Sequence, residues 1–181
     1  MSATPLLRTR RLTLGPLCGD DAATLVTLAG AFEIADTTAT IPHPYGDDDA
    51  RMFLALDAAE RAAGDALRFA VRPDGESLIG VVGLQQITND RLRAELGYWI
   101  GVPWWGMGYA TEAARAVVRY GFDELGLHKI HAHYLTRNPA SGKVLERVGM
   151  RQEGLLREEV RKWGRFEDVI VCGILRTDPR P

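Results

Sequence analysis

The hydrophobic positions in the first third of the chain follow two different periods. Residues 11–16 (RLTLGP) alternate as a strand does, whereas residues 19–28 and 47–63 repeat their apolar positions as helices do. Aspartates begin both predicted helices, where negative charge favours the helix start. Two prolines and a glycine in residues 41–46 predict a loop before the second helix.

The middle of the chain changes to a strand pattern. Residues 67–71, 78–87 and 92–102 are apolar runs separated by short polar segments, and residues 73–75 (PDG) have the composition of a hairpin turn. Short connections between successive strands favour antiparallel pairing, so these three runs predict a meander.

The last part of the chain returns to alternating helix and strand. The pattern predicts a helix at 108–122, a strand at 129–135, a helix at 140–148 that ends at Gly149, and a closing strand pair at 150–160 and 167–175. This order of elements predicts an α/β (α+β) fold in a single domain over residues 1–181. The sheet is expected to be mixed, with helices on both faces and a right-handed strand–helix–strand crossover.

Composition excludes several classes of partner. The 181 residues have a formal net charge of -2, so there is no basic excess for nucleic acid. No segment has the roughly 20 apolar residues of a membrane span, and the N-terminus does not resemble a signal peptide. We therefore expect a cytoplasmic location. Cys18 and Cys172 have no metal-binding spacing and are expected to be reduced, mostly buried thiols.

Residues 103–111 (PWWGMGYAT) join a predicted strand to the clearest predicted helix. A helix start presents unpaired N–H groups and a partial positive charge, and small residues let a ligand approach the main chain. This segment therefore suits a phosphate or pyrophosphate, although a plain tight turn is the alternative. It is neither a P-loop nor a complete Rossmann fingerprint.

The same segment carries a family resemblance. Residues 105–110 (WGMGYA) resemble the pyrophosphate loop of the GNAT N-acetyltransferases, Q/R-x-x-G-x-G/A, with Trp105 where Gln or Arg is usual. The continuation in residues 111–113 (TEA) resembles the branch of ribosomal-protein N-terminal (alanine/serine) acetyltransferases. Residues 138–150 (NPASGKVLERVGM) resemble the second coenzyme A motif, and residues 7–14 (LRTRRLTL) resemble the branch's opening strand.

The resemblance implies a mostly antiparallel, splayed central sheet and the use of acetyl-CoA as cosubstrate. The acetyl group would pass to a primary amine by direct attack in a ternary complex. A protein N-terminal α-amine is the expected acceptor, since its pKa near ~8 lies below the ~10.4 of lysine. A small-molecule amine (aminoglycoside, polyamine or amino-acid-like), a non-catalytic CoA-binding module and an unrelated phosphate-binding α/β protein are the alternatives. A homodimer is plausible from the resemblance.

The resemblance also assigns the residues that would hold the cofactor. Backbone groups at the end of the third meander strand would pair with the pantetheine arm, and amides of the glycine-rich segment would hold the pyrophosphate. Polar side chains of the second coenzyme A motif would contact other parts of the cofactor, including the sulfur and the 3′-phosphate. These residues are Ile100, Gly101 and Val102 for the arm, Gly106, Met107, Gly108, Tyr109, Ala110 and Thr111 for the pyrophosphate, and Asn138, Ser141 and Lys143 beyond. Lys143 could equally be a solvated helix charge.

Two residues are candidates for proton transfer. Glu95 stands where the family often places a glutamate, and it is expected to accept the amine proton directly or through water. The alternative is a surface carboxylate paired with Arg91 or Arg93. Leu145 occupies the position of the family's usual acidic tyrosine, so Ser141 is the expected substitute. Tyr134 is a weaker one.

Two of the four histidines have a spacing that could suit a metal ion. His131 and His133 share one strand face, but no acidic or cysteine ligand joins them at a convincing spacing, so no metal is expected. His43 lies in the proline-rich loop, in a region that helps to form the acceptor site in this family.

Overall fold

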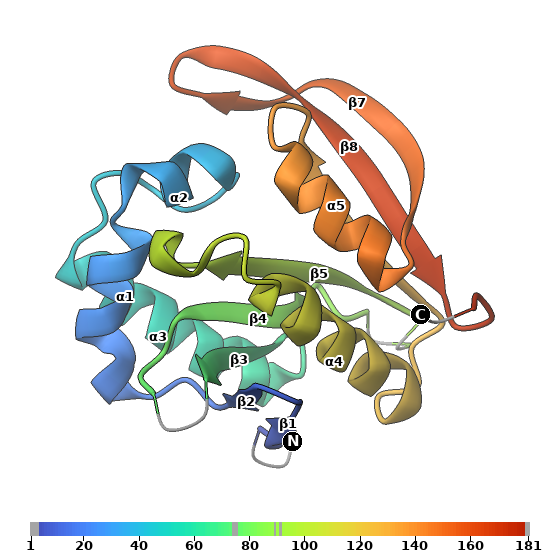
Figure 1. The fold of residues 1–181 in the computed structure, drawn as a ribbon, viewed down its shortest axis with the longest axis horizontal. Helices are drawn as coiled ribbons and strands as arrows, with labels where there is room; N and C mark the ends of the chain where they lie inside the picture. Colours follow the sequence, from blue (N-terminus) through green and yellow to red (C-terminus); the bar gives the residue numbers. More distant parts are fainter. Residues whose placement is uncertain (1–3, 74–75, 89, 91, 180–181) are drawn as a thin grey trace.

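The computed structural model describes residues 4–73, 76–88, 90 and 92–179 (Figure 1). Its order of elements is β1 (Leu7–Arg8), β2 (Leu12–Gly15), η1 (Gly19–Asp21), α1 (Ala22–Ala29), α2 (Phe32–Thr37), α3 (Asp47–Ala63), β3 (Leu67–Pro73), β4 (Gly80–Gln85), β5 (Arg93–Ile100), η2 (Val102–Trp104), α4 (Tyr109–Asp123), β6 (Lys129–Leu135), α5 (Pro139–Val148), β7 (Arg151–Lys162) and β8 (Arg165–Leu175).

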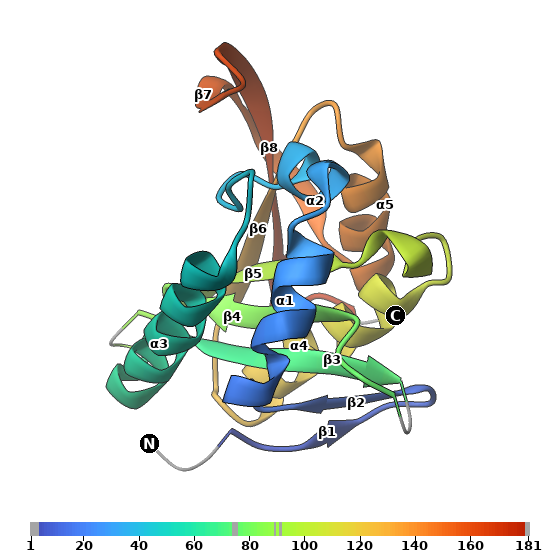
Figure 2. The same ribbon diagram turned by 90° about the vertical axis from the view of Figure 1, so that its left-hand side faces the viewer.

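The described strands form one sheet in the order β1-β2-β3-β4-β5-β6-β8-β7. All neighbours are antiparallel except β5 and β6, which are parallel and are joined by α4. These two strands pair only from Arg93 opposite Lys129 to Glu95 opposite His131, and then they part. Figure 2 shows the result: β1 to β5 run across the view, whereas β6 and β8 run nearly upright. The predicted splayed, mixed sheet is confirmed.

Helices cover both faces of the sheet, as predicted (Figures 1 and 2). On one face, α4 buries Val117 and Phe122 against strand residues such as Leu84, in the larger core. On the other, α1 and α3 bury Leu25 and Ala50 in a smaller core. No helix in the described part of the chain is both long and apolar enough to cross a membrane.

The predicted elements agree with the structure most closely where the pattern is long. Helix α3 has the predicted bounds, whereas β1 and α2 were not predicted because two and six residues are too short for a period to show. The predicted strand at 92–102 ends at Ile100 and continues as η2. The predicted turn at 73–75 lies partly outside the described residues. Both cysteines are free, but Cys18 is exposed, contrary to prediction, and only Cys172 is buried.

Glu112 ties the N-terminal strands to the start of α4. Its Oε1 accepts hydrogen bonds from Thr9 Oγ1 (2.7 Å) and the Arg11 amide (2.8 Å), and its Oε2 pairs with Arg11 Nε at 2.7 Å. Burial alone would raise the pKa of Glu112, but the hydrogen bonds from Thr9 and Arg11 lower it below its ordinary value. The clamp is therefore strongest when the carboxylate is ionised.

Glu112→Gln tests this clamp, because glutamine presents an amide donor to the Arg11 guanidinium. We expect the free energy of unfolding at pH 7 to fall by about 1–3 kcal/mol. A carboxylate whose pKa is lower in the folded state stabilises the fold at pH values above its unfolded pKa of about 4.5. This stabilisation is lost as the pH falls through the pKa of the folded state. The difference from wild type, measured by urea denaturation, should therefore shrink below about pH 4.5. Glu124→Gln, at the exposed residue that follows α4, is the control. An equal loss of stability there would contradict the clamp.

Candidate functional site

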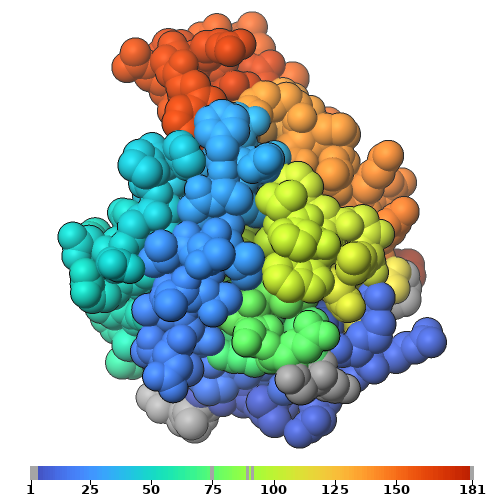
Figure 3. All heavy atoms as spheres, turned by 60° about the vertical axis from the view of Figure 1, so that its left-hand side comes forward, coloured from blue at the N-terminus to red at the C-terminus, as the bar shows by residue number. Residues whose placement is uncertain are grey.

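The glycine-rich segment forms an exposed turn at the start of α4. Gly106 and Gly108 have φ of +76° and +81°, in the left-handed region that favours glycine, and Gly108 is the N-cap of α4. Arg11 contacts the turn in two ways. Its Nη1 donates to the Met107 carbonyl (2.9 Å), and its guanidinium lies 4.5 Å from the centre of the Tyr109 ring. In Figure 3 the yellow-green atoms of residues 102–110 lie open on the surface between the blue helices and α5.

A hollow of about 410 Å³ adjoins this helix start. Besides Gly108, Thr111 and Glu112, the residues that line it are four arginines: Arg10, Arg11, Arg115 and Arg147. Arg115 also donates to the Arg147 carbonyl (2.6 Å), which joins α4 to α5. The sequence-based prediction missed these arginines. The available signal was the helical spacing, which places Arg115 one turn beyond Thr111 on the same face.

The start of α5 holds two of the predicted cofactor residues. Asn138 is the N-cap, its Oδ1 accepts from the Ser141 amide (3.2 Å), and its Nδ2 donates to the Thr37 carbonyl (3.1 Å). Ser141 Oγ lies 2.8 Å from the hydroxyl of Tyr98, which comes from β5. Burial raises the pKa of Tyr98 far above its ordinary value, so its hydroxyl stays protonated. Lys143 is exposed on α5.

Leu145, at the position of the family's usual tyrosine, lies in the core. Leu145 is 1% exposed and belongs to the larger core, so this position contributes to packing. Tyr134 packs against Gly142 instead: a Cβ built on that glycine would lie 2.8 Å from the Tyr134 hydroxyl and ring. Tyr134 therefore lies beside the start of α5.

The end of β5 has part of its backbone already engaged. The Ile100 carbonyl accepts a hydrogen bond from Trp105 Nε1 (2.6 Å), and the Gly101 amide donates to the Ile79 carbonyl (2.8 Å). The Val102 carbonyl accepts from the Trp105 amide within η2 (3.1 Å). Trp105 therefore links the glycine-rich turn to the strand end, which places both predicted cofactor segments side by side.

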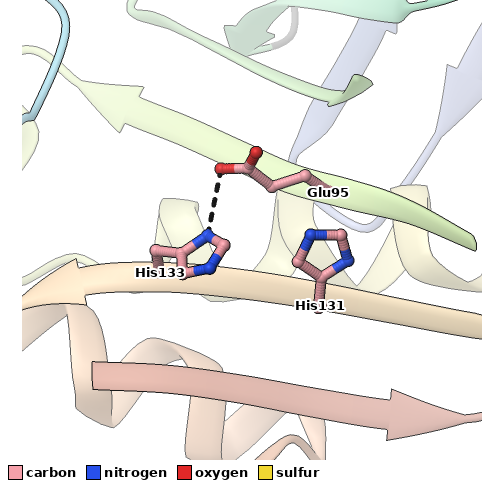
Figure 4. A group of neighbouring side chains, drawn as sticks. All are labelled: Glu95, His131 and His133. Carbon is pink, nitrogen blue, oxygen red and sulfur yellow. Dashed lines mark hydrogen bonds and ion pairs between the residues drawn. The ribbon is translucent and has the colours of Figure 1, made fainter. Parts of the chain in front are cut away.

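Glu95 lies at the last rung before β5 and β6 part. Its Oε1 is 3.4 Å from His133 Nδ1, and His131 lies directly opposite in the register (Figure 4). His133 is thus the partner of Glu95 in this structure. Arg91, one of the two alternative partners that the sequence offered, lies outside the described residues. Burial lowers the pKa of His131, with Glu95 opposing this and the nearby positive groups adding to it. The side chain of Glu95 is 17% exposed, so solvent reaches it.

Strand alternation divides the site between two faces of the sheet. Glu95 and Tyr98 are an odd number of residues apart on β5, so their side chains point to opposite faces. Tyr98 packs against the larger core and reaches α5 on that side. Glu95 faces the side of α1 and α3, the same side as Trp99 of the smaller core. Beyond Glu95, β5 and β6 are no longer paired, so the two faces of the sheet are not separated there by a continuous strand pair.

Ion pairs and aromatic contacts join α2 to the β7–β8 hairpin. Arg137 pairs with Asp36 (2.9 Å) and with Glu167 (3.1 Å). Phe32 stacks on Trp163 with ring centres 5.3 Å apart, and His43 meets the Phe32 ring edge-on at 5.4 Å. His43 therefore packs on the aromatic pair.

Comparison with known proteins agrees with this geometry. Residues 11–151 match the family model described as acetyltransferase (GNAT) domain. Among curated relatives, the uncharacterized N-acetyltransferase YoaA of Bacillus subtilis is 31% identical over 95% of this chain and 97% of its own length. The [ribosomal protein uS5]-alanine N-acetyltransferase of Escherichia coli is 32% identical over 65% of this chain, and the match spans 62% of that enzyme. Two further relatives are matched over 65% and 58% of their lengths.

Among solved structures, spermidine N-acetyltransferase from Vibrio cholerae in complex with CoA and spermine superposes with a TM-score of 0.82. It is 29% identical, and the superposition covers 94% of this chain and 98% of that one. The family model alone covers well over half of the chain. The chain therefore belongs to the GNAT family and is an acetyl-CoA-dependent N-acetyltransferase.

Proposed function

We propose that this enzyme transfers the acetyl group of acetyl-CoA to the α-amine at the N-terminus of a protein. The observation that carries the proposal is the meeting of three features where β5 and β6 part. The glycine-rich start of α4 and the Ser141–Tyr98 hydroxyl pair lie at this opening, and Glu95 faces it from the other side of the sheet. Acetyl donor and amine acceptor would approach from opposite faces. A cytoplasmic location, one domain and a homodimer stay predictions.

The cofactor would lie along the α4 and α5 side. The amides of Gly106, Met107, Gly108, Tyr109, Ala110 and Thr111 would hold the pyrophosphate, because a helix start offers unpaired N–H groups and partial positive charge. The arginines that line the adjacent hollow add charge for the phosphates. The pantetheine arm would then pass between the parted strands, along Ile100, Gly101 and Val102, toward Asn138 and Ser141. Lys143, exposed on α5, is a second candidate for phosphate contact.

On the other side, Glu95 would take the proton that the attacking amine loses. Its carboxylate is reached by solvent and lies 3.4 Å from His133, so a proton can pass on to the imidazole or to water. The neutral amine then attacks the thioester carbonyl carbon. The C–S bond breaks, the nitrogen loses its second proton to water or to the Glu95–His133 pair, and the leaving thiolate of coenzyme A takes up a proton.

Ser141 would supply that proton or stabilise the thiolate. The Tyr98 hydroxyl stays protonated and has two acceptors on Ser141, the carbonyl oxygen at 3.1 Å and Oγ at 2.8 Å. In the second arrangement Tyr98 donates to Oγ. The proton of Ser141 is then free to point toward the sulfur. Tyr98 acts here as a positioning residue.

The charges around the Glu95 side favour a singly charged acceptor over a polyamine. Asp36 and Glu167 are both paired with Arg137, and Asp48 pairs with Arg51 at the start of α3. Asp49 accepts from the Gly46 amide as part of a helix cap. Asp36, Glu167 and Asp49 therefore already have partners, which leaves fewer carboxylates on α2, α3 and β8 for a polyamine. The uS5-alanine relative points the same way, whereas the spermidine enzyme makes a small-molecule amine the second candidate.

The arginine-lined hollow can be tested with Arg147→Gln. We expect the dissociation constant of coenzyme A to rise about tenfold, equivalent to about 1.4 kcal/mol. Arg119→Gln, one turn further along α4 than Arg115, should leave it unchanged. Isothermal titration with coenzyme A and dephospho-coenzyme A checks which phosphate is involved, because a contact with the 3′-phosphate affects only the former. Unchanged affinity for both ligands would exclude Arg147 from the site.

Glu95→Gln tests the proposed base. Removing a positioned proton acceptor should lower kcat by about 10²–10⁴-fold, whereas the stabilisation by acetyl-CoA in thermal denaturation should stay at the wild-type value. Release of free coenzyme A, followed with a thiol reagent, gives the rate. A non-catalytic CoA-binding module would show binding without turnover already in the wild type. Wild-type kcat in the variant would remove Glu95 from the mechanism.

The acceptor is tested by competition among amines. Peptides with a free N-terminal alanine or serine should give at least a tenfold higher kcat/KM than the same peptides with a blocked N-terminus and one lysine, or than spermidine and an aminoglycoside. Mass spectrometry of the products locates the acetyl group. A higher kcat/KM for spermidine would contradict the proposed acceptor and indicate a polyamine instead.

A further inference from the structure

Glu95, His131 and His133 form a cluster of three potential metal ligands. One ligand atom from each lies within 4.8 Å of the others, and no other such group of three occurs in the part of the chain that the structure describes. Figure 4 shows both imidazoles of β6 projecting beside the Glu95 carboxylate. The sequence alone separates these residues by up to 38 positions, so the carboxylate partner of the histidine pair could not be recognised there.

The strands hold the three ligands on a rigid base. His131 and His133 are two residues apart on β6, so they share one face of the sheet. Glu95 is paired with His131 across the last rung between β5 and β6. The backbone positions are therefore fixed by the sheet, and only side-chain rotations are needed to adjust the ligand atoms.

The distances suit a transition-metal ion of the size of zinc. Bonds of about 2.0–2.1 Å in a tetrahedron place ligand atoms about 3.4 Å apart. Glu95 Oε1 and His133 Nδ1 already lie 3.4 Å apart, and the widest pair must close by at most about 1.4 Å. Two imidazoles and one carboxylate favour Zn²⁺, Co²⁺ or Ni²⁺ over Mg²⁺ and Ca²⁺, which prefer oxygen ligands.

We propose that Glu95, His131 and His133 bind one divalent transition-metal ion, and that this ion inhibits the enzyme by competing with the acceptor amine. Three protein ligands leave a position for water, as in open zinc sites. The ion would occupy the carboxylate that takes the amine proton, on the face opposite to the cofactor. This second half of the proposal rests on the proposed role of Glu95, whereas the binding of the metal does not.

Positive charge near the site moderates the expected affinity. Lys129 and Arg93 act on His131 electrostatically, although Lys129 is also paired with Glu153 at 2.6 Å. We therefore expect a dissociation constant for Zn²⁺ on the order of 10 µM, well weaker than that of a closed four-ligand site. Such a site would be empty at low free zinc and filled when zinc rises.

Direct titration tests the site without relying on activity. Zn²⁺ is titrated calorimetrically into tag-free, chelator-treated protein that carries Cys18→Ser, which removes the exposed thiol as a competing ligand. We expect one Zn²⁺ per chain, and a loss of affinity of at least tenfold in His131→Gln and in His133→Gln. His128→Gln, an exposed histidine just before β6, is the matched control and should bind as the parent does. No binding by the parent, or equal binding by all three variants, would overturn the site.

Kinetics then tests the inhibition. Zn²⁺ should raise the apparent KM for the amine and leave the thermal stabilisation by acetyl-CoA unchanged, and His131→Gln should weaken the inhibition in proportion to its loss of zinc affinity. Zinc binding with no change in the KM for the amine would refute competition. A metal-free parent enzyme with no turnover on any amine would refute the proposed function, while the calorimetric titration would still decide the metal site.

Discussion

The parting of β5 and β6 after a single short stretch of parallel pairing is the constraint on which the rest of the structure depends. A strand edge without a partner leaves backbone N–H and C=O groups unpaired, which is unfavourable unless something else pairs with them. In this protein, contacts across the opening hold it in place: Tyr98 of β5 reaches Ser141 of α5, and Arg137 joins α2 to β8. The opening is thus built into the fold, and the proposed path of the pantetheine arm runs along it.

The same constraint arranges the charges. Both α4 and α5 begin at this end of the sheet, so two helix N-termini with their partial positive charge face the region where phosphates and a developing thiolate would lie. On the other side of the sheet, the ionisable groups nearest the opening are Glu95 and the two histidines. In the proposed arrangement, an anionic donor and a cationic acceptor would be separated by the sheet until they meet at its gap.

Sequence patterns predicted the parts of the fold that are local. The period of α3, the glycines that start α4 and the Gly149 that ends α5 are each encoded within a few neighbouring residues. The contacts that define the site are not. Tyr98 meets Ser141 across 43 positions, and Glu95 meets His133 across 38, because both depend on the register of a parallel pair that no short motif specifies. The family resemblance therefore named candidate site residues, whereas the contacts between them came only from the structure.

Leu145 illustrates how a change in the core can move a chemical role. Ser141 and Leu145 are one helical turn apart, and Leu145 is fully committed to the larger core. A phenol is nevertheless present beside Ser141, supplied by Tyr98 from the neighbouring strand. Because burial keeps that phenol protonated, it can donate a hydrogen bond to Ser141 and so orient the serine hydroxyl. In the proposed mechanism, Ser141 held by Tyr98 would take the place of the tyrosine that α5 lacks.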